Sequence, residues 1–326
     1  MSRLVRRPIV VHVHEGSTSM RVAITGSSGL VGTELRTQLS AAGHDIVRVE
    51  RGERGSLPVV WQPAQQWIAP AALEGCDAVV HLAGASIGDG RWSANRKREL
   101  WNSRIDSTRL LVEHFATLKQ KPSVFVCASA IGVYGNRGDE ELSDDAAAGG
   151  GFLADLVQAW EAEAHKAEAL GIRVVTLRSA IVLAQDGGAL AKMLTPFKFG
   201  VGGRLGSGKQ WMSWIALEDE ARAIAWTLTH EELHGPVNLA APHPTRNADF
   251  TKVLGHVLHR PTLFPVPKFG LRLLFGQMGE ELLLYSQRVA PTKLQRSGFA
   301  FHYPELETAL EAALGKAAST PLASVA

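Results

Sequence analysis

The sequence predicts an α/β fold, in which a doubly wound parallel sheet is joined by a smaller mixed α/β domain. Short apolar runs rich in β-branched residues alternate with amphipathic stretches of helical period through about residue 180. The first of these runs leads directly into a glycine-rich turn and then a helix. Beyond residue 180 the pattern changes, because glycine pairs and proline-rich stretches separate shorter elements.

Length and composition limit the possible classes of protein. The chain has 326 residues, 45% hydrophobic and 20% charged, as expected of a soluble globular protein with a sizeable core. A formal net charge of +2 gives no case for a nucleic-acid or membrane partner, and no apolar run approaches the roughly 18 residues of a membrane helix. Cys76 and Cys127 adjoin apolar runs, which favours buried thiols and a cytoplasmic location.

Four regions follow from these patterns. Met20 stands directly before the first strand, so the residues ahead of it are expected to be a flexible extension, and a small-residue tail follows Gly315. His12 and His14 in the extension lack further nearby ligands, so no metal site is predicted. The regions are 1–19 (extension), 20–180 (sheet domain), 181–316 (substrate and C-terminal domain) and 317–326 (tail).

The glycine-rich turn is the strongest local signal. Arg21–Thr25 reads as a buried strand, and apolar residues recur at helical spacing from Val31 to Gly43. Between them, glycines spaced G-x-x-G-x-x-G let the backbone approach a pyrophosphate, which the N–H groups and dipole of the helix N-terminus attract. The sequence therefore predicts a dinucleotide site; its contacts are Gly26, Ser27, Ser28, Gly29, Leu30, Val31 and Gly32.

The second strand, Asp45–Val49, leads into Glu50 and Arg51. An acidic residue here binds a ribose 2′-hydroxyl, as in NAD, whereas an arginine accommodates the 2′-phosphate of NADP. Because both residues are present, the residues themselves leave NAD and NADP open.

Further strands and helices place more residues at the same cleft. Strands are predicted at 59–61, 77–83, 123–128 and 172–177, and helices at 96–118 and 152–170. Ligands of a doubly wound sheet bind beyond the carboxyl ends of its strands. The additional cofactor contacts expected there are Leu82, Ala83, Gly84, Arg104 and Ser129.

Longer stretches carry a family resemblance. With the glycine turn, HLAG, ASAIGVYG, RKRELWNSRIDSTRLLVE, GGALAKMLTPFKFGVGGRLGSGKQWMSWI and FPVPKFGLRLLFG, the chain resembles the extended short-chain dehydrogenase/reductases. More closely it is similar to their atypical "epimerase family" subgroup, which carries a small C-terminal domain of unknown function. The resemblance covers Met20 to about Leu310 and implies a Rossmann-type domain that binds NAD(P), usually NADPH. Glu50 departs from the Thr typical of that subgroup, so NAD(H) stays possible.

The catalytic pair usual in that superfamily is absent. Its members place a Lys four residues after a Tyr, but the residues four beyond Tyr134, Tyr285 and Tyr303 are Gly, Val and Glu. By alignment, Leu153 and Val157 occupy the positions of the pair. Two functions remain: an oxidoreductase or epimerase that uses other acids and bases, or a non-catalytic dinucleotide-binding sensor or interaction module.

Tyr134 and Ser129 are the catalytic candidates, with Arg104 and Asp155 also able to reach the cleft. Tyr134 follows the fifth strand, and the alternative for it is a packing role in its loop. Arg178 could face the cofactor or pair with a carboxylate.

Arginines beside aromatic residues suit a flat or anionic substrate, such as a nucleotide or phosphorylated compound. The alternative is that at least one tryptophan belongs to the core. The substrate candidates are Arg91, Trp92, Arg204, Trp211 and Trp214.

Three features have less specific meanings. Residues 203–209 read G-x-x-x-x-G-K, but Gln210 replaces the hydroxyl residue of a P-loop, so a mobile flap over the cleft is expected instead of ATP binding. Asp219 is expected to have a structural role at the start of a helix. The apolar stretch 268–285 could pack on the sheet edge, contact a second subunit or line the substrate entrance, so a monomer and a homodimer are both open.

Overall fold

The computed structural model describes residues 19–52, 59–70 and 72–316. The predicted extension up to residue 18, with His12 and His14, and the tail from residue 317 lie outside the described residues. Within the described part, no helix is long and apolar enough to cross a membrane.

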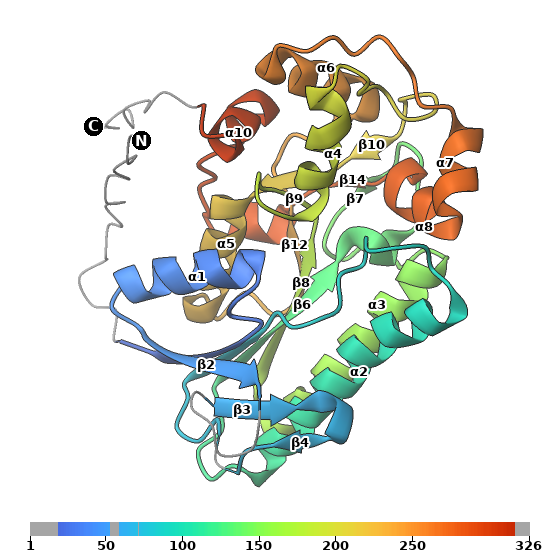
Figure 1. Ribbon diagram of the computed structural model, residues 1–326. Coiled ribbons are helices and arrows are strands. Elements are labelled where there is room, and N and C mark those ends of the chain that lie inside the picture. Colours follow the sequence, from blue (N-terminus) through green and yellow to red (C-terminus); the bar gives the residue numbers. More distant parts are fainter. Residues whose placement is uncertain (1–18, 53–58, 71, 317–326) are drawn as a thin grey trace, which may run out of the picture.

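The main sheet has eight strands and confirms the predicted doubly wound architecture (Figure 1). All neighbouring strands are parallel except β3 and β4. The chain starts at β1 in the middle, moves outward through β2 to β4, and then returns to the other side through β5. In spatial order the strands are β12 (Gly235–Leu239), β8 (Arg173–Ser179), β6 (Val124–Ala130), β5 (Ala78–His81), β1 (Arg21–Thr25), β2 (Asp45–Arg51), β3 (Val59–Gln62) and β4 (Trp67–Ile68).

Helices cover both faces of this sheet. On one face α1 (Leu30–Ala41) packs beside α5 (Leu217–Thr229), and on the other α2 (Ala94–Thr117) packs beside α3 (Phe152–His165) (Figure 1). The two-residue period of a strand explains the division: Val22 and Ile24 of β1 join the core under α1 and α5, whereas Ala23 joins the core under α2.

Several element boundaries differ from the predictions. The helix predicted over 152–170 ends at His165 and continues as a 3₁₀ turn, η3 (Lys166–Leu170), up to Gly171 in the left-handed region. β6 continues to Ala130, so Ser129 lies inside a strand. β12 and α5 follow residue 180 in the chain, yet they complete the main sheet and its cover.

The smaller part is built from short elements around its own core. Its core includes Trp214, Phe250 and Leu190, and its helices are α4 (Gly188–Lys198), α6 (Asn247–Leu258) and α10 (Leu306–Ala313).

The other short elements of the described structure are η1 (Pro63–Gln65), η2 (Ile131–Tyr134), β7 (Glu141–Leu142), β9 (Ile181–Leu183), β10 (Trp211–Met212), β11 (Trp214–Ala216), β13 (Thr245–Arg246), α7 (Lys268–Phe275), α8 (Gln277–Gly279), η4 (Glu280–Leu284), β14 (Arg288–Val289) and α9 (Thr292–Arg296).

Asp219 joins the two parts in the structural role predicted for it. Its carboxylate is fully buried and accepts hydrogen bonds from the backbone N–H groups of His302 (2.9 Å) and Tyr303 (2.8 Å). Arg222, one turn along α5, donates to the same carboxylate. The start of α5 is thereby tied to the segment that leads into α10.

Candidate dinucleotide site

The turn between β1 and α1 requires glycine at two of its three glycine positions. Gly26 has φ +68°, and a Cβ there would lie 2.9 Å from the backbone N of Ala83. A Cβ on Gly32 would lie only 2.2 Å from the carbonyl oxygen of Gly26. Gly29 has more room, with the same oxygen 3.2 Å away and φ at −73°. The turn is therefore as tight as a pyrophosphate cradle requires.

Hydrogen-bond donors at this turn lack partners. The N-cap of α1 is Gly29, no side chain caps the helix, and its first turn has no acidic residue. Ser27 is 1% exposed, and its hydroxyl finds no hydrogen-bond partner among the described residues. A cavity of about 380 Å³ adjoins the turn; it is lined by Ser28, Gly29, Leu30, Thr33, Glu34, Asp186 and Leu217. Free N–H groups, an unpartnered hydroxyl and this cavity fit a dinucleotide.

A buried series of hydrogen bonds holds the segment that follows β5 against the glycine turn. The hydroxyl of Thr25 accepts from the backbone N of Ala83 (3.3 Å) and bonds to His81 Nδ1 (2.7 Å). His81 Nε2 contacts the Ser107 hydroxyl at 3.2 Å. Burial lowers the pKa of His81 to about 3, so its ring is neutral at physiological pH.

Arg104 lies beneath the next turn of the chain, close to Gly84. Its guanidinium donates to the carbonyl of Ala85 (3.0 Å) and lies 5.2 Å from the ring centroid of Trp160. Burial lowers the pKa of Arg104 to about 10, which leaves it charged at neutral pH. The structure thus brings Gly26–Gly32, Leu82–Gly84 and Arg104 together at one edge of the sheet.

At the end of β2, Glu50 and Arg51 differ in their surroundings. The Glu50 carboxylate is hydrogen-bonded to the guanidinium of Arg48. Arg51 is exposed, and no hydrogen bond or ion pair is recorded for it in the described part of the chain. The sequence placed these residues side by side but gave no sign that Arg48 pairs with Glu50.

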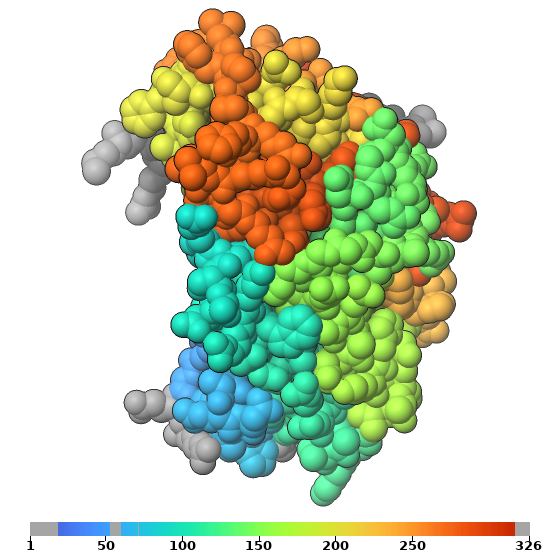
Figure 2. Space-filling view, turned by 90° about the vertical axis from the view of Figure 1, so that its right-hand side faces the viewer, coloured from blue at the N-terminus to red at the C-terminus, as the bar shows by residue number. Residues whose placement is uncertain are grey.

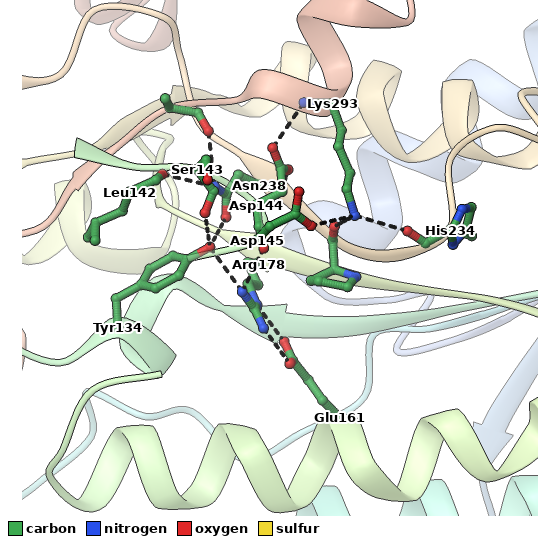
Figure 3. Close-up of polar contacts among 12 residues, drawn as sticks. Tyr134, Leu142, Ser143, Asp144, Asp145, Glu161, Arg178, His234, Asn238 and Lys293 are labelled. Atoms are coloured by element: carbon green, nitrogen blue, oxygen red, sulfur yellow. Dashed lines mark hydrogen bonds and ion pairs between the residues drawn. The ribbon is translucent and has the colours of Figure 1, made fainter. Parts of the chain in front are cut away.

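The carboxyl end of β8 is occupied by a closed polar network (Figure 3). Arg178 donates from Nε and Nη2 to the two carboxylate oxygens of Glu161, both at 2.8 Å. Its Nη1 donates to the Tyr134 hydroxyl (3.1 Å), which in turn donates to Asn238 Oδ1 (2.6 Å). The Ser129 hydroxyl donates to Glu161 at 2.6 Å. Burial alone would lower the pKa of Arg178, but the Glu161 carboxylate raises it above its ordinary value.

The burial of Tyr134 in this network favours the packing role over the catalytic one. Tyr134 is 0% exposed, and burial raises its pKa, whereas a tyrosine proton donor needs a lowered one. Ser129 is also buried, with its hydroxyl committed to Glu161. Arg178 pairs with a carboxylate, one of the two alternatives left open for it. Sequence reasoning missed Glu161, although a charge four residues after Val157 on an apolar stripe was a usable signal.

A second buried acid lies on the opposite face of the same strand. Glu220 of α5 is 2% exposed, and its Oε1 accepts from the Ser179 hydroxyl at 2.5 Å. Its Oε2 has no partner among the described residues. Burial raises the pKa of Glu220 to about 8, so this carboxyl is largely protonated at neutral pH. Neither residue was predicted from the sequence to take part in the site.

The substrate candidates do not converge. Trp214 is fully buried in the core, and Trp92 is 9% exposed, with its indole N–H donating to the Ile87 carbonyl. Trp214 thus lies in the core, the alternative left open for at least one tryptophan, because apolar neighbours cover its ring. Arg91 and Arg204 are exposed, and Asp155 also faces solvent.

Trp211 lies between two guanidinium groups, 4.1 Å from Arg246 and 5.0 Å from Arg288 to the ring centroid. Its neighbours Gln210 and Arg246 line a larger cavity, of about 740 Å³. That cavity is lined by Gly138, Asp139, Gly206, Ser207, Gly208, Lys209, Gln210, Arg246, Ala248, Asp249, Lys268, Leu284 and Ser286.

The glycine-rich loop 203–209 is not a free flap over the glycine turn. It lines the larger cavity, and its backbone is tied to neighbours: Gly206 N–H donates to Val266 (2.8 Å) and Leu205 N–H donates to Asn247 Oδ1 (2.7 Å). A Cβ on Gly203 would lie 1.8 Å from the Phe264 carbonyl oxygen. The glycines here serve close backbone packing instead of mobility.

The stretch 268–285 packs on the start of α3. The Glu281 carboxylate accepts hydrogen bonds from the backbone N–H groups of Phe152 (3.1 Å) and Leu153 (2.9 Å). A carboxylate at a helix N-terminus is favoured by the free donors and the dipole there. This contact fixes η4 against the start of α3.

The described residues contain neither a metal-binding cluster nor a disulfide. These contain no group of three or more His, Cys, Asp or Glu side chains able to hold a metal ion. Cys76 and Cys127 are free and buried, as predicted.

Fold and site together define a nicotinamide-dinucleotide-binding protein of the doubly wound class. Residues 22–240 match the NAD dependent epimerase/dehydratase family, and residues 266–313 match a domain of unknown function (DUF1731). The chain belongs to the NAD dependent epimerase/dehydratase family. The resemblance inferred from the sequence is thereby confirmed.

Individual relatives are similar along most of their length. "Epimerase family protein ML0860" of Mycobacterium leprae is 40% identical over 297 residues, which cover 91% of this chain and 96% of the relative. The crystal structure of human epimerase family protein SDR39U1 with NADPH has a TM-score of 0.82 at 32% identity, covering 91% of this chain and 100% of the other. The UDP-N-acetylglucosamine 4-epimerase of Bacillus cereus, at 16% identity and TM-score 0.73 over 91% of this chain and 99% of that enzyme, shares the fold.

Proposed function

We propose that this chain binds NADPH at the glycine turn and uses it in a redox or epimerisation step on a small molecule in the adjoining cleft. The observation that carries the proposal is the set of unpartnered donors at the start of α1, together with the free hydroxyl of Ser27. When bound, a nicotinamide supplies a hydride donor or acceptor. The similarity to a human relative solved with NADPH supports the same cofactor.

The preference for NADPH over NADH rests on the end of β2. Because Arg48 holds the Glu50 carboxylate, that carboxylate is less available to a ribose 2′-hydroxyl. Arg51 is exposed and free to meet a 2′-phosphate. Loss of a charged contact to a phosphate costs on the order of tenfold or more in affinity.

A titration with NADPH and NADH tests this preference. Arg51→Ala should weaken NADPH at least tenfold and leave NADH nearly unchanged, and Arg98→Ala, an exposed control on α2, should change neither. Equal losses for both nucleotides would remove the assigned role of Arg51. Glu50→Thr should change little; a large gain in NADPH affinity would mean that Glu50, and not Arg51, sets the preference.

For catalysis, we assign the chain to the atypical subgroup, because no Tyr in the sequence has a Lys four residues later. Ser179 is the group best suited to move a proton: it is half-buried at the carboxyl end of β8, and its hydroxyl bonds to the largely protonated Glu220. A phosphate- or nucleotide-bearing substrate is supported by Lys209, Arg246 and Lys268 around the larger cavity.

The second candidate function is a dinucleotide-binding sensor or interaction module without turnover. Tyr134 and Ser129 favour it, because their hydroxyls are buried and committed within the network. Incubation of the NADPH-loaded protein with fractionated small-molecule extracts distinguishes the two candidates. Oxidation of NADPH that Ser179→Ala abolishes supports an enzyme; tight binding without oxidation by any fraction supports the sensor. A cytoplasmic location, supported by the two free buried thiols, suits both.

A further inference from the structure

The exposed large hydrophobic side chains of the described residues gather in two segments, 199–201 and 263–275. Their exposure ranges from 36% at Phe275 to 79% at Phe199. We refer to them as the apolar patch: Phe199, Val201, Leu263, Phe264, Phe269, Leu273, Leu274 and Phe275. A patch of this kind marks an interaction surface, because scattered single residues are the rule elsewhere on soluble proteins.

The two segments lie side by side, although about sixty residues separate them in the chain. Gly206 N–H donates to the Val266 carbonyl, and Val266 N–H donates to the Arg204 carbonyl, both at 2.8 Å. Arg260 Nε donates to the Lys198 carbonyl at 3.0 Å. Figure 2 shows the same arrangement from outside, with the yellow and orange segments adjoining at the top of this face.

α7 has no partner for most of its apolar side chains. Only Leu271 of its eight residues is buried, whereas Phe269, Leu273, Leu274 and Phe275 are exposed. The chain after α7 turns to α3 through Glu281, so nothing in the described part covers the outer side of the helix. A short helix with phenylalanine and leucine facing outward, and with Lys268 and Arg272 among them, has the composition of an interfacial helix.

Positive charge surrounds the apolar patch. Residues 187–217 and 250–279 contain no Asp or Glu, although the whole chain carries 32 acidic residues against 34 basic ones. Lys198, Arg204 and Lys268 are exposed and have no carboxylate within ion-pair distance in the described part. The Lys and Arg residues of these two segments are Lys192, Lys198, Arg204, Lys209, Lys252, Arg260, Lys268 and Arg272. Three of these cations pair with carboxylates outside the two segments, Lys192 with Asp89, Lys252 with Asp249 and Arg272 with Glu280, so the local excess of positive charge is carried by the remaining five.

We propose that the apolar patch and its basic surroundings dock on the surface of an anionic lipid bilayer. The exposed phenylalanines and leucines enter the interfacial layer, and the surrounding lysines and arginines meet the anionic headgroups. A second copy of the chain suits this surface less well, because a two-fold interface would place the same cations against each other. The proposal revises the expectation, drawn from net charge, that no membrane is involved. It does not rest on the dinucleotide function.

Flotation with lipid vesicles tests the proposal on the full chain. The protein should float with vesicles of phosphatidylcholine and phosphatidylglycerol, and not with phosphatidylcholine alone, and added salt should weaken the binding. Phe269→Ser/Leu273→Ser removes apolar contacts, and Lys198→Glu lowers the charge of the patch by two units; each should lower the partition coefficient at least tenfold. Lys119→Ala/Lys121→Ala removes two exposed charges from the segment between α2 and β6 and should leave it unchanged.

Thermal unfolding and NADPH affinity should be unaltered in all three variants, because the substituted side chains are exposed and outside the dinucleotide site. Failure of the wild type to float with anionic vesicles, or equal flotation with neutral ones, would overturn the proposal. The proposal would also be overturned if the wild type bound no vesicles and formed a dimer, and if Phe269→Ser/Leu273→Ser converted that dimer to a monomer. A second copy of the chain would then cover the patch. Unchanged NADPH affinity separates each of these results from a failure of the dinucleotide function.

Discussion

The carboxyl ends of β1 and β8 lie at the same edge of the sheet and are built in opposite ways. At the end of β1, the glycine turn leaves donors without partners in the part of the chain that the structure describes: the first N–H groups of α1 and the hydroxyl of Ser27. At the end of β8, Arg178, Glu161 and Tyr134 satisfy one another. Unpartnered polar groups are costly unless a ligand meets them, whereas a closed network needs no ligand.

This difference distinguishes the groups that bind a ligand from the groups that support the fold more clearly than the residue types do. Ser, Tyr and Arg near a cofactor cleft suggest chemistry when read from the sequence. In the structure the same residue types form the scaffold, and the groups left open for a ligand are backbone N–H groups and one small hydroxyl. Four predictions test the contrast, from the largest expected effect to the smallest.

Arg178→Met should cause the largest loss of stability. It leaves the Glu161 carboxylate buried with Ser129 as its remaining partner, and breaking a buried ion pair costs about 3–5 kcal/mol. Denaturant unfolding should show this loss, while the folded fraction keeps its NADPH affinity. The double variant Arg178→Met/Glu161→Leu should recover much of the stability. A loss of NADPH affinity without a loss of stability would make Arg178 a ligand contact. It would contradict the contrast between the two strand ends.

Glu220→Gln tests how the buried carboxyl of Glu220, whose Oε2 has no partner among the described residues, affects stability. The folded pKa of about 8 lies above the ordinary 4.5, so the folded protein keeps a proton that the unfolded chain has lost. The contribution of Glu220 to stability therefore falls as pH rises from 4.5 to about 8 and is constant above that range.

Because Gln cannot ionise, the variant should gain stability relative to wild type toward high pH, by several kcal/mol between acidic and alkaline conditions. Urea unfolding across this pH range measures the difference. Glu113→Gln, on the exposed face of α2, should show none. A difference between Glu220→Gln and wild type that does not change with pH would mean that Glu220 is ionised when folded.

Gly29→Asp should abolish NADPH binding while the fold is kept. Gly29 has φ −73°, which any residue adopts, and a Cβ there would lie 3.2 Å from the Gly26 carbonyl oxygen, so a small shift of that oxygen accommodates a side chain; the new carboxylate then faces the position of the pyrophosphate. A loss of at least a hundredfold is expected, about 2.7 kcal/mol. Gly29→Ala is the matched control and should lose far less. Unchanged affinity in Gly29→Asp would move the binding site away from this turn.

Tyr134→Phe should have the smallest effect. It removes a hydroxyl that accepts from Arg178 and donates to Asn238, which costs about 1–2 kcal/mol of stability. NADPH affinity should stay within a factor of two of wild type. If stability is kept but binding or turnover collapses, Tyr134 is a working part of the site and its assignment to the scaffold is wrong.

Much of the fold could be predicted because its signals are local. The run Arg21–Thr25, the glycines after it and the helical period that follows lie within a few turns of chain, and each dictates its own conformation. Cys76 and Cys127 were predicted to be buried for the same reason. The central strands and helices appeared within a few residues of their expected bounds.

The pairings across the chain could not be predicted. Glu161 meets Arg178 from a different element, and Glu281 caps α3 from 128 residues away. Trp214 looks the same in sequence whether it lines a cleft or fills a core, and only the packing around β11 decides. Likewise, the sum of charges concealed the one-sided distribution of cations, because the two basic segments meet only in the fold.

Hydrogen–deuterium exchange with and without NADPH tests the central contrast most directly, because it reports both strand ends in one experiment. NADPH should slow exchange in peptides that cover Gly26–Val31, because the first N–H groups of α1 have no side-chain cap. Peptides that cover Leu142–Asp144 and Asn238 should exchange equally in both states, because their network is complete without ligand. Protection confined to the Tyr134 network, with none at the glycine turn, would contradict the account.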